Sequence, residues 1–256
     1  MAAVITHIWD CGLVARWFHT RGGEWYAAAR FAKFVKAASA RANHTILACD
    51  PDGPTWRHAI FPAYKADREK KRDPEEYAKL IKQIVGAIRL VGEFATCLGA
   101  EGAEADDVIG TVSKRAIEAG HVVVVFSGDK DMAQLLARWA PLLRLHDGKQ
   151  EVTDEVLKER FGIGSAHIAD YLAIAGDHVD GIPGVPGLGP VAAVELISNH
   201  GSLSNALIAA SNAFQAAPDT MPTTLRKLHL NADKAILSAR LIELKYDVPL
   251  RFPWEN

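Results

Sequence analysis

The sequence lacks three features that would place it outside ordinary intracellular proteins. Its 256 residues include only three cysteines, and a sparse, odd number argues against a disulfide framework and for a reducing setting. The apolar stretch at residues 122–126 is far shorter than the roughly 20 apolar residues of a membrane-spanning helix. The first ten residues lack the basic start and long apolar run of a secretory signal. We therefore expect a cytoplasmic protein that does not insert into a membrane.

The sequence also has little net charge, and its composition is not that of a disordered chain. Apolar residues make up 49% and charged residues 23%, which is the balance of a globular protein, whereas disorder needs low hydrophobicity and high net charge. A net charge of −2 does not by itself indicate nucleic-acid binding, which is typical of a basic patch. However, if the acids discussed below gather in one cleft, the remaining surface is net basic.

Apolar runs of strand length alternate with helical patterns in the first part of the chain. Strands are predicted at 4–9, 45–49, 122–126 and 142–145, and helices at 24–41, 75–98, 105–119 and 131–137. This alternation is typical of an α/β fold with a mainly parallel central sheet and flanking helices. Later, only short helices are predicted, at 153–161, 165–175, 190–199, 202–210 and 224–244. We therefore expect an α/β core over 1–150 and a helical region over 151–256.

Acidic residues follow three of the predicted strands, at Asp10, Asp50 and Asp129. Because ligands of parallel sheets bind beyond the carboxyl ends of the strands, three acids at such ends predict a shared site. Further acids stand at loop heads and at the start of one helix, namely Glu104, Asp106, Asp107, Asp131, Asp177 and Asp180. Those at the helix start have an alternative explanation, because acids favour helix N-termini through capping and the helix dipole.

Such a concentration of acids favours divalent metal ions. Carboxylates at close range do not all ionise without a counter-cation, and Mg²⁺ prefers oxygen ligands. Two such ions about 4 Å apart can stabilise both the attacking and the leaving oxygen of a phosphodiester. No cysteines and histidines have the spacing of a zinc site. We predict that these acids bind two Mg²⁺ or Mn²⁺ ions.

Residues 57–72 form a basic segment with interleaved aromatic side chains. Its cations are Arg57, Lys65, Arg68, Lys70, Lys71 and Arg72. A charged run is usually a solvated loop, and that alternative stays open. Phe61 and Tyr64 lie between the cations, however, as is typical where bases stack on aromatic rings. We expect the segment to bind a phosphate chain beside the predicted metal site.

The loop at residues 176–189 reads GDHVDGIPGVPGLG. Glycines permit positive φ and close backbone approach, and successive N–H groups before a helix N-terminus can bind an anion. Gly184, Gly187 and Gly189, just before a helix that begins at Pro190, are the predicted phosphate contacts. A tight turn between two helices is the alternative explanation of the same composition.

Together these segments closely resemble the 5′-nuclease family, which includes flap endonucleases and the 5′–3′ exonuclease domain of bacterial DNA polymerase I. The matching motifs follow the family order: IWD (8–10), CDPDGPTWRH (49–58), PAYKADR (62–68), EADD (104–107), SGDKDMAQLL (127–136) and the loop 176–189. They cover most of residues 4–200. The resemblance implies a monomeric, stand-alone, PIN-like nuclease that hydrolyses DNA with 5′ ends, flaps or junctions in replication and repair.

The resemblance also implies roles for particular residues. All of the acids named above match metal ligands of the family, some of them acting through water. Lys65 and Arg68 match catalytic cations at the base of a helical arch over 54–73, and Tyr64 matches a position that stacks on a base. Residues 165–199 match a helix–three-turn–helix motif that holds the duplex backbone and often a K⁺ ion.

The sequence departs from the family at three positions. Cys11 follows Asp10 where the family usually has glycine, and Arg16 stands six rather than about seven positions after Asp10. Val191 stands where the family usually has a lysine, which predicts weaker, more salt-sensitive duplex binding.

Two other functions are considered. The motif DPDGPT at 50–55 resembles the start of haloacid-dehalogenase-like phosphatases, and a DNA-structure binding protein without cleavage would share the basic segment and the loop. The phosphatase does not account for the acids at 104–107. Exonuclease and flap-endonuclease preferences are not separated by the sequence.

Overall fold

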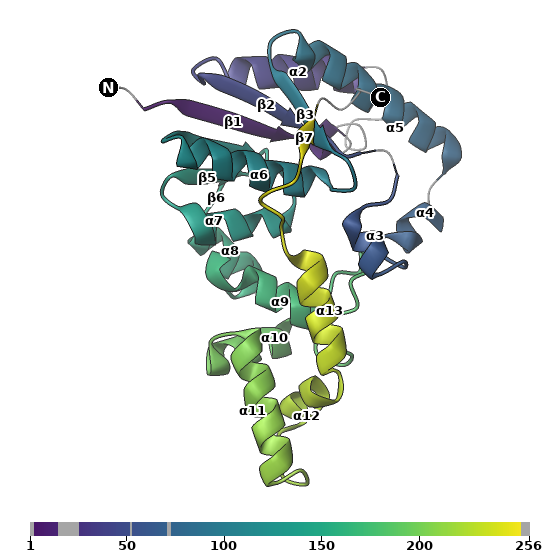
Figure 1. Ribbon diagram of the computed structural model, residues 1–256, viewed down its shortest axis with the longest axis vertical. Helices are drawn as coiled ribbons and strands as arrows, with labels where there is room; N and C mark the ends of the chain where they lie inside the picture. The colour runs from purple at the N-terminus through teal and green to yellow at the C-terminus, as the bar shows by residue number, and fades with distance from the viewer. Residues whose placement is uncertain (1–2, 15–25, 52, 71–72, 252–256) are drawn as a thin grey trace. The chain divides into compact units, whose positions relative to one another are not determined.

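The structure is a computed structural model of the chain, and it describes residues 3–14, 26–51, 53–70 and 73–251. Its described strands form one sheet in the order β6-β5-β4-β1-β2-β3-β7 (Figure 1). The strands are β1 (Ile5–Asp10), β2 (His44–Ala48), β3 (Thr96–Ala100), β4 (Val122–Phe126), β5 (Leu143–His146), β6 (Glu151–Val152) and β7 (Leu250–Arg251). The five central strands pair in parallel, and β6 and β7 join the edges antiparallel. The predicted mainly parallel sheet is confirmed.

The strand order changes direction at β1. The chain moves outward from β1 to β2 and β3, and then returns to the other side of β1 for β4 and β5. In open parallel sheets, the crevice at such a switch point is where ligands bind. The carboxyl ends of β1 and β4 are therefore the place in this fold where a functional site is expected.

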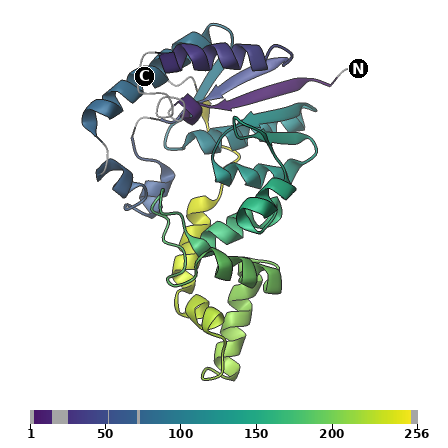
Figure 2. The same cartoon turned by 180° about the vertical axis from the view of Figure 1, so that it is seen from behind.

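Helices cover both faces of the sheet. They are α2 (Tyr26–Ala38) and α5 (Pro74–Gly92) on one face, and α6 (Ala105–Glu118) and α7 (Ala133–Trp139) on the other (Figures 1 and 2). Phe31 and Val35 of α2 pack with Trp9 in one buried cluster, whereas Val108 and Ile109 of α6 pack in a second cluster with the sheet. Strand β4 of the sheet between these layers is wholly apolar, as is typical of a strand buried on both faces.

The chain divides into two compact units. The first contains residues 1–59, 71–152 and 244–256, and includes the sheet. The second contains residues 60–70 and 153–243. This division differs from the expected one at 150/151 in two segments. Residues 60–70 of the basic segment belong to the helical unit, and residues 244–251 belong to the unit of the sheet.

The second unit is helical. Its helices are α4 (Ala66–Lys70), α8 (Asp154–Phe161), α9 (Ile168–Ala175), α10 (Pro190–His200), α11 (Leu203–Ala216), α12 (Thr223–Leu230) and α13 (Ala232–Ile242). Helix α9 packs against α10 and α13, and α11 packs against α12. A further short helix, α3 (Trp56–Ile60), joins the two units. No helix of the described residues is long and apolar enough to cross a bilayer.

Three predicted helices are wrong in their extent. The helix predicted at 202–210 continues to Ala216. The helix predicted at 75–98 ends at Gly92, and residues 96–100 form β3. Cys97 and Leu98 continued the apolar spacing of the helix, so periodicity alone did not separate the two elements. The helix predicted at 224–244 is interrupted at Asn231, which caps both α12 and α13. The short strands β6 and β7 were not predicted.

Candidate functional site

Acidic side chains gather at the carboxyl edge of the sheet. Asp10 is the last residue of β1, Asp50 follows β2 by two residues, and Asp129 follows β4 by three. These strands are parallel neighbours, so their ends lie at one edge, as the sequence predicted. Glu104 and Asp106 stand at the start of α6, which follows the next strand of the sheet.

Asp10 is held in place by two donors. The Ser127 hydroxyl donates to its Oδ2 at 2.7 Å, and the Gly12 N–H donates to its Oδ1 at 2.7 Å. A Cβ at position 12 would lie only 2.9 Å from Oδ1, so glycine is needed for this approach. Burial raises the pKa of Asp10 to about 6, and the charges of Asp50 and Asp129 add to the rise against the two hydrogen bonds. The Asp10 side chain is therefore held in one orientation, while its surroundings disfavour its negative charge.

Asp106 shows the same crowding more strongly. Burial raises its pKa well above the usual range, and the charges of Asp129, Asp10, Glu104 and Asp50 all raise it further. The five side chains are therefore close enough to repel one another. A buried cluster of like charges is costly without a counter-cation, and a divalent cation would relieve this repulsion.

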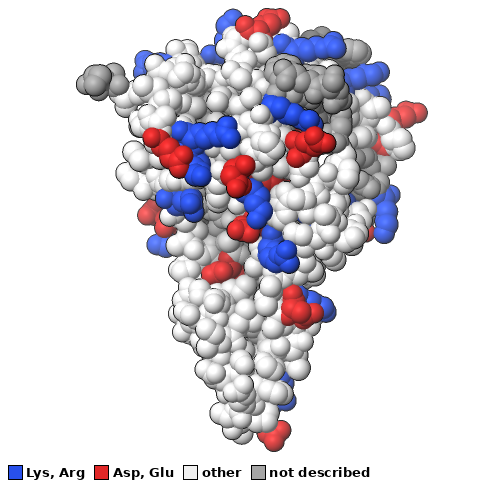
Figure 3. Space-filling view, viewed as in Figure 1, with Lys and Arg blue, Asp and Glu red and all other residues white. Residues whose placement is uncertain are grey.

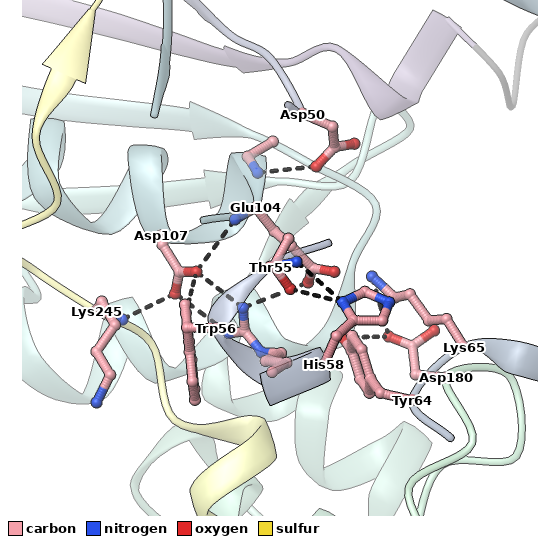
Figure 4. A network of polar contacts seen from close by, with 12 residues as sticks. Asp50, Thr55, Trp56, His58, Tyr64, Lys65, Glu104, Asp107, Asp180 and Lys245 are labelled. Carbon is pink, nitrogen blue, oxygen red and sulfur yellow. Dashed lines mark hydrogen bonds and ion pairs between the residues drawn. The ribbon is translucent and has the colours of Figure 1, made fainter. Parts of the chain in front are cut away.

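The donor set fits hard divalent cations, which prefer carboxylate oxygens. Within the described ranges, no three acidic, histidine or cysteine side chains already converge on one ion position. Asp50 instead accepts a hydrogen bond from the Ala105 N–H at 2.9 Å (Figure 4). Asp129 accepts one from the N–H of Asp131, a buried residue in the short 3₁₀ helix Lys130–Met132. The cluster thus has the negative charge and the oxygen atoms that a divalent cation needs, while Asp50 and Asp129 accept hydrogen bonds from backbone amides.

Asp107 has different surroundings from its neighbour Asp106. It is fully buried and accepts hydrogen bonds at Oδ2 from Trp56 Nε1 at 2.9 Å and from Arg57 Nη1 at 2.8 Å. Its Oδ1 accepts from Arg57 Nη2 at 3.2 Å and from the Lys245 N–H at 2.9 Å. The Glu104 N–H donates to Oδ2 at 3.3 Å (Figure 4).

This network changes two expectations. A carboxylate has about four lone-pair positions, and those of Asp107 are occupied by protein donors, so its surroundings argue against the predicted metal contact. Arg57 is 2% exposed and also pairs with Glu104 at 3.4 Å, so its side chain is not presented to a DNA backbone as predicted. Instead, the pair ties α3 to the start of α6. Asp107 therefore fits the alternative explanation by helix capping, because its carboxylate accepts a hydrogen bond from the N–H of Glu104, the N-cap residue of α6.

Within the second unit, the basic segment packs on Asp180. Lys65 Nζ lies 3.8 Å from Asp180 Oδ2, the Arg68 guanidinium pairs with Oδ1, and the Tyr64 hydroxyl donates to Oδ2 at 3.5 Å. Arg68 Nε also donates to the Val179 carbonyl at 3.0 Å. Tyr64 is 3% exposed, so it is not placed to stack on a base as predicted.

The remaining cations of the basic segment are less informative. Lys70 is exposed and lies 3.8 Å from Asp67. Lys71 and Arg72, and likewise Arg16, lie outside the described residues. Lys65 itself has a positive φ of 57°, a conformation that costs a non-glycine residue energy and is often found at functional sites.

The glycine-rich loop holds itself together through its backbone. Asp177 pairs with Ile182 through two backbone hydrogen bonds of 3.0 and 2.8 Å. Gly184 has a φ of 62°, and a Cβ there would lie 2.5 Å from the Gly176 nitrogen. The Gly184 N–H donates to the Ser238 hydroxyl at 3.0 Å, so this amide is used inside the protein rather than presented to a phosphate as predicted.

The last two glycines of the loop lie at the start of α10. Gly189 is its N-cap, and Pro190 is its first residue. The carbonyl of Gly187 accepts a hydrogen bond at 3.0 Å from Lys227 Nζ of α12, so a cation from a distant part of the chain reaches the loop. Val191 is 83% exposed and adds no charge there.

Helix α11 carries no charged side chain. The face seen in Figure 3 is correspondingly poor in charge over the lower helices, in contrast to the upper part of that view. Phosphate binding in the helical unit would therefore rest on the loop before α10 and on Lys227 rather than on α11.

Sequence reasoning missed three residues that shape the site. Ser127 and Gly12 orient Asp10, and Lys227 reaches the glycine-rich loop. Ser127 stands in the motif SGDKD, directly after a strand, which is a signal that could have been used. The contact of Lys227 with Gly187 spans 40 positions, and no local pattern marks it.

The chain matches two protein-family models over adjoining ranges. The 5′-3′ exonuclease N-terminal resolvase-like domain matches residues 13–162. The 5′-3′ exonuclease C-terminal SAM fold matches residues 163–256.

Individual proteins are similar over most of the chain. DNA polymerase I of Pseudomonas aeruginosa is 38% identical over 202 residues, which are 78% of this chain and 22% of that protein. The flap endonuclease Xni of Shewanella pealeana is 32% identical over 210 residues, 81% of this chain and 76% of that protein. The chain thus spans about a quarter of the polymerase relatives and three quarters of the smaller relative.

Solved structures show the same fold. A T5 5′-exonuclease with bound zinc ions superposes with a TM-score of 0.80 at 20% identity, covering 94% of this chain and 89% of that one. The likeness extends over both units of the chain, and at this identity it concerns the fold.

Proposed function

This chain belongs to the 5′-3′ exonuclease family, as its motifs indicated, and from that premise we propose that it is a divalent-metal-dependent 5′-nuclease. It hydrolyses phosphodiester bonds of DNA that has 5′ ends, flaps or junctions, in replication or repair. The observation that carries this proposal is the crowding of Asp10, Asp50, Glu104, Asp106 and Asp129, whose charges raise the pKa of Asp106 and Asp10.

These five carboxylates are the proposed ligands of two Mg²⁺ or Mn²⁺ ions. Metal ions bound there would stabilise the charge that develops on the attacking and leaving oxygens of the phosphodiester. The protein's part is to fix the carboxylates: Ser127 orients Asp10, and the first amide of α6 orients Asp50. Asp131, Asp177 and Asp180 stay predicted as further ligands, acting directly or through water, and Asp107 is left out of the set.

Lys65 and Arg68 are the proposed cations for the scissile phosphate. Both now neutralise Asp180, and side chains that already pair with a carboxylate are suited to exchange it for a phosphate. The positive φ of Lys65 is consistent with a segment held ready for such an exchange. The positive charges of both side chains would then stabilise the negative charge of the transition state.

The loop before α10 is the proposed contact with the duplex backbone. Gly187 and Gly189 and the ammonium of Lys227 lie at the start of that helix, and amides at a helix N-terminus favour anions. A K⁺ ion at this loop stays a prediction, as does a monomeric state. The free thiols of all three cysteines suit the reducing cytoplasm expected from the sequence.

A cleavage assay tests the proposal. A 5′-flap substrate and a blunt duplex, each labelled at the 5′ end, are incubated with the protein and Mg²⁺, with EDTA as the control. We expect metal-dependent release of the intact flap or of short 5′ fragments, and the ratio of the two products separates endonuclease from exonuclease preference. Metal-dependent binding without any product would instead favour a non-cleaving DNA-structure binding protein.

Variants link the products to the acid cluster. Asp10→Asn is expected to abolish cleavage while duplex binding persists, and Asp247→Asn, at an exposed acid of the same unit, is expected to cleave normally. Release of phosphate from small phosphomonoesters without DNA cleavage would favour the phosphatase alternative. Normal turnover by Asp10→Asn would overturn the assignment of the site.

A further inference from the structure

Two cysteines that the proposed mechanism does not use lie across adjacent strand ends. Asp10 of β1 is in register with Ala48 of β2, so the next residues on each strand, Cys11 and Cys49, are neighbours. The Cys11 N–H donates to the Ala48 carbonyl at 2.9 Å, which continues the pairing past the strand ends. Adjacent strands lie about 4.8 Å apart, and disulfides join residues whose Cα atoms are about 4.4–6.8 Å apart.

The two side chains meet in the protein interior. Both residues are buried in the cluster that contains Trp9 and Phe126, and the Cys49 thiol donates to the Leu47 carbonyl at 3.7 Å. Each also adjoins a proposed metal ligand: Cys11 follows Asp10 directly, and Cys49 directly precedes Asp50.

Cys97 differs from this pair and serves as an internal control. It is equally buried, but it is in register with Leu47 rather than with Cys49. Its thiol donates to the Ile88 carbonyl at 3.6 Å. Burial is therefore shared by all three cysteines, whereas cross-strand placement is particular to Cys11 and Cys49.

We propose that Cys11 and Cys49 are an oxidative modification site, where a reversible disulfide joins the strand ends that carry Asp10 and Asp50 and suppresses nuclease activity. The formation of the disulfide rests on the placement of the two residues alone. Its effect on cleavage rests on the proposed function.

The co-reactant is a peroxide. One thiol attacks a peroxide oxygen, the O–O bond breaks, and a sulfenic acid and one water form. The second thiol then attacks the sulfenic sulfur, an S–S bond forms, and a second water leaves. Two thiols are thus oxidised by two electrons, one hydrogen peroxide is reduced to two waters, and a dithiol reverses the modification.

The thiols' surroundings keep the reaction slow. Both side chains are buried, and buried thiols are less reactive than exposed ones. The pair therefore stays reduced at low peroxide concentration and is modified under sustained oxidation.

Closing the bond changes the metal centre. A disulfide fixes its two sulfurs about 2.05 Å apart with a defined dihedral angle, so both side chains must reorient directly beside Asp10 and Asp50, which moves these carboxylates. Because a displacement of about 1 Å at a catalytic group can cost about 100-fold in rate, we expect a loss of cleavage of that order.

Peptide mapping of the native full chain tests the proposal. The protein is treated with hydrogen peroxide, its remaining thiols are alkylated, and its peptides are separated without reduction. We expect one linked peptide pair containing Cys11 and Cys49, alkylated Cys97, and a roughly 100-fold loss of flap cleavage that dithiothreitol reverses. A link through Cys97, or full alkylation of Cys11 and Cys49 after the treatment, would overturn it.

Matched variants separate the bond from general oxidation. Cys49→Ala is expected to give no linked peptide and to keep its cleavage rate after peroxide, whereas Cys97→Ala is expected to behave as the unmodified sequence does. Equal loss of cleavage in Cys49→Ala would refute the inhibitory effect. The mapping needs neither a variant nor cleavage, so a protein that cut no DNA would still reveal whether the disulfide forms.

Discussion

Two adjacent aspartates are expected to respond in opposite ways to the same substitution. Asp107→Asn removes the nearer of the two carboxylates that pair with the buried Arg57, whereas Asp106→Asn removes a charge that four neighbouring carboxylates oppose. The first change should therefore destabilise the fold, and the second should spare the fold but impair metal binding. The sequence alone treats the two positions alike, because both are acids in the first turn of one helix.

The magnitude for Asp107 follows from its surroundings. Removing one partner of a buried ion pair costs up to about 3–5 kcal/mol, and because Glu104 still lies 3.4 Å from Arg57, we expect a loss toward the lower end of this range. An asparagine keeps one acceptor oxygen, so some donors among Trp56, Lys245 and Glu104 also lose their partner. Since typical domains have about 5–15 kcal/mol of stability, this variant should lose a large part of its own. Asp106→Asn should unfold at an equal or higher denaturant concentration.

Urea unfolding in the presence of EDTA measures the difference. The two variants, Asp247→Asn and the unsubstituted chain are compared at one pH, and a double variant Arg57→Gln/Asp107→Asn completes a cycle. We expect the double variant to be less destabilised than the two single effects added together, because each single variant already removes the shared Arg57–Asp107 interaction. Unfolding of Asp107→Asn at the same urea concentration as the unsubstituted chain would refute the structural part assigned to this residue.

Three further outcomes are expected. Ser127→Ala should weaken Mn²⁺ binding about 10–100-fold, as is typical when an outer partner of a ligand is lost, because its hydroxyl orients Asp10; unchanged affinity in a Mn²⁺ titration would contradict this. Gly184→Ala should lower the melting temperature clearly and Gly189→Ala should not, because only the former has a positive φ and a backbone atom within 3 Å of the new Cβ; equal melting temperatures would argue against the loop geometry. The hydrogen bonds that Asp154 accepts from Ser165 lower its pKa below the usual 3.8. Their contribution to the stability of the fold is therefore complete above pH 3.8 and is lost as the pH falls through the lower pKa of the folded state. Asp154→Asn should show a smaller loss of melting temperature on acidification than the unsubstituted chain, and equal losses would contradict this.

Much of the fold could be predicted because its signals are local. The run at 122–126 has the composition of a strand buried on both faces, and Asp10 and Asp50 mark the ends of two parallel strands. By contrast, β3 was hidden by apolar spacing that continued from the preceding helix. The two-residue strand β7 returns from the end of the chain to pair with β3, a contact that no short-range pattern marks.

The site was predicted as a list of residues but not as an arrangement. Position and residue type placed Asp10, Asp50 and Asp129 at one edge, since the ends of parallel strands coincide. Which acids are paired inside the protein depends on contacts that are distant in sequence, such as Arg57 with Asp107 across 50 positions. The same holds for Asp180, whose cationic partners come from a segment more than 110 positions earlier.

The most direct test of the central claim is a Mn²⁺ titration followed by electron paramagnetic resonance. The claim is that the carboxylates at the carboxyl edge of the sheet form a metal centre. We expect the unsubstituted chain and Asp247→Asn to bind Mn²⁺ with the same affinity, and Asp106→Asn to bind it much more weakly while remaining folded. Equal Mn²⁺ binding by a folded Asp106→Asn variant would contradict the account.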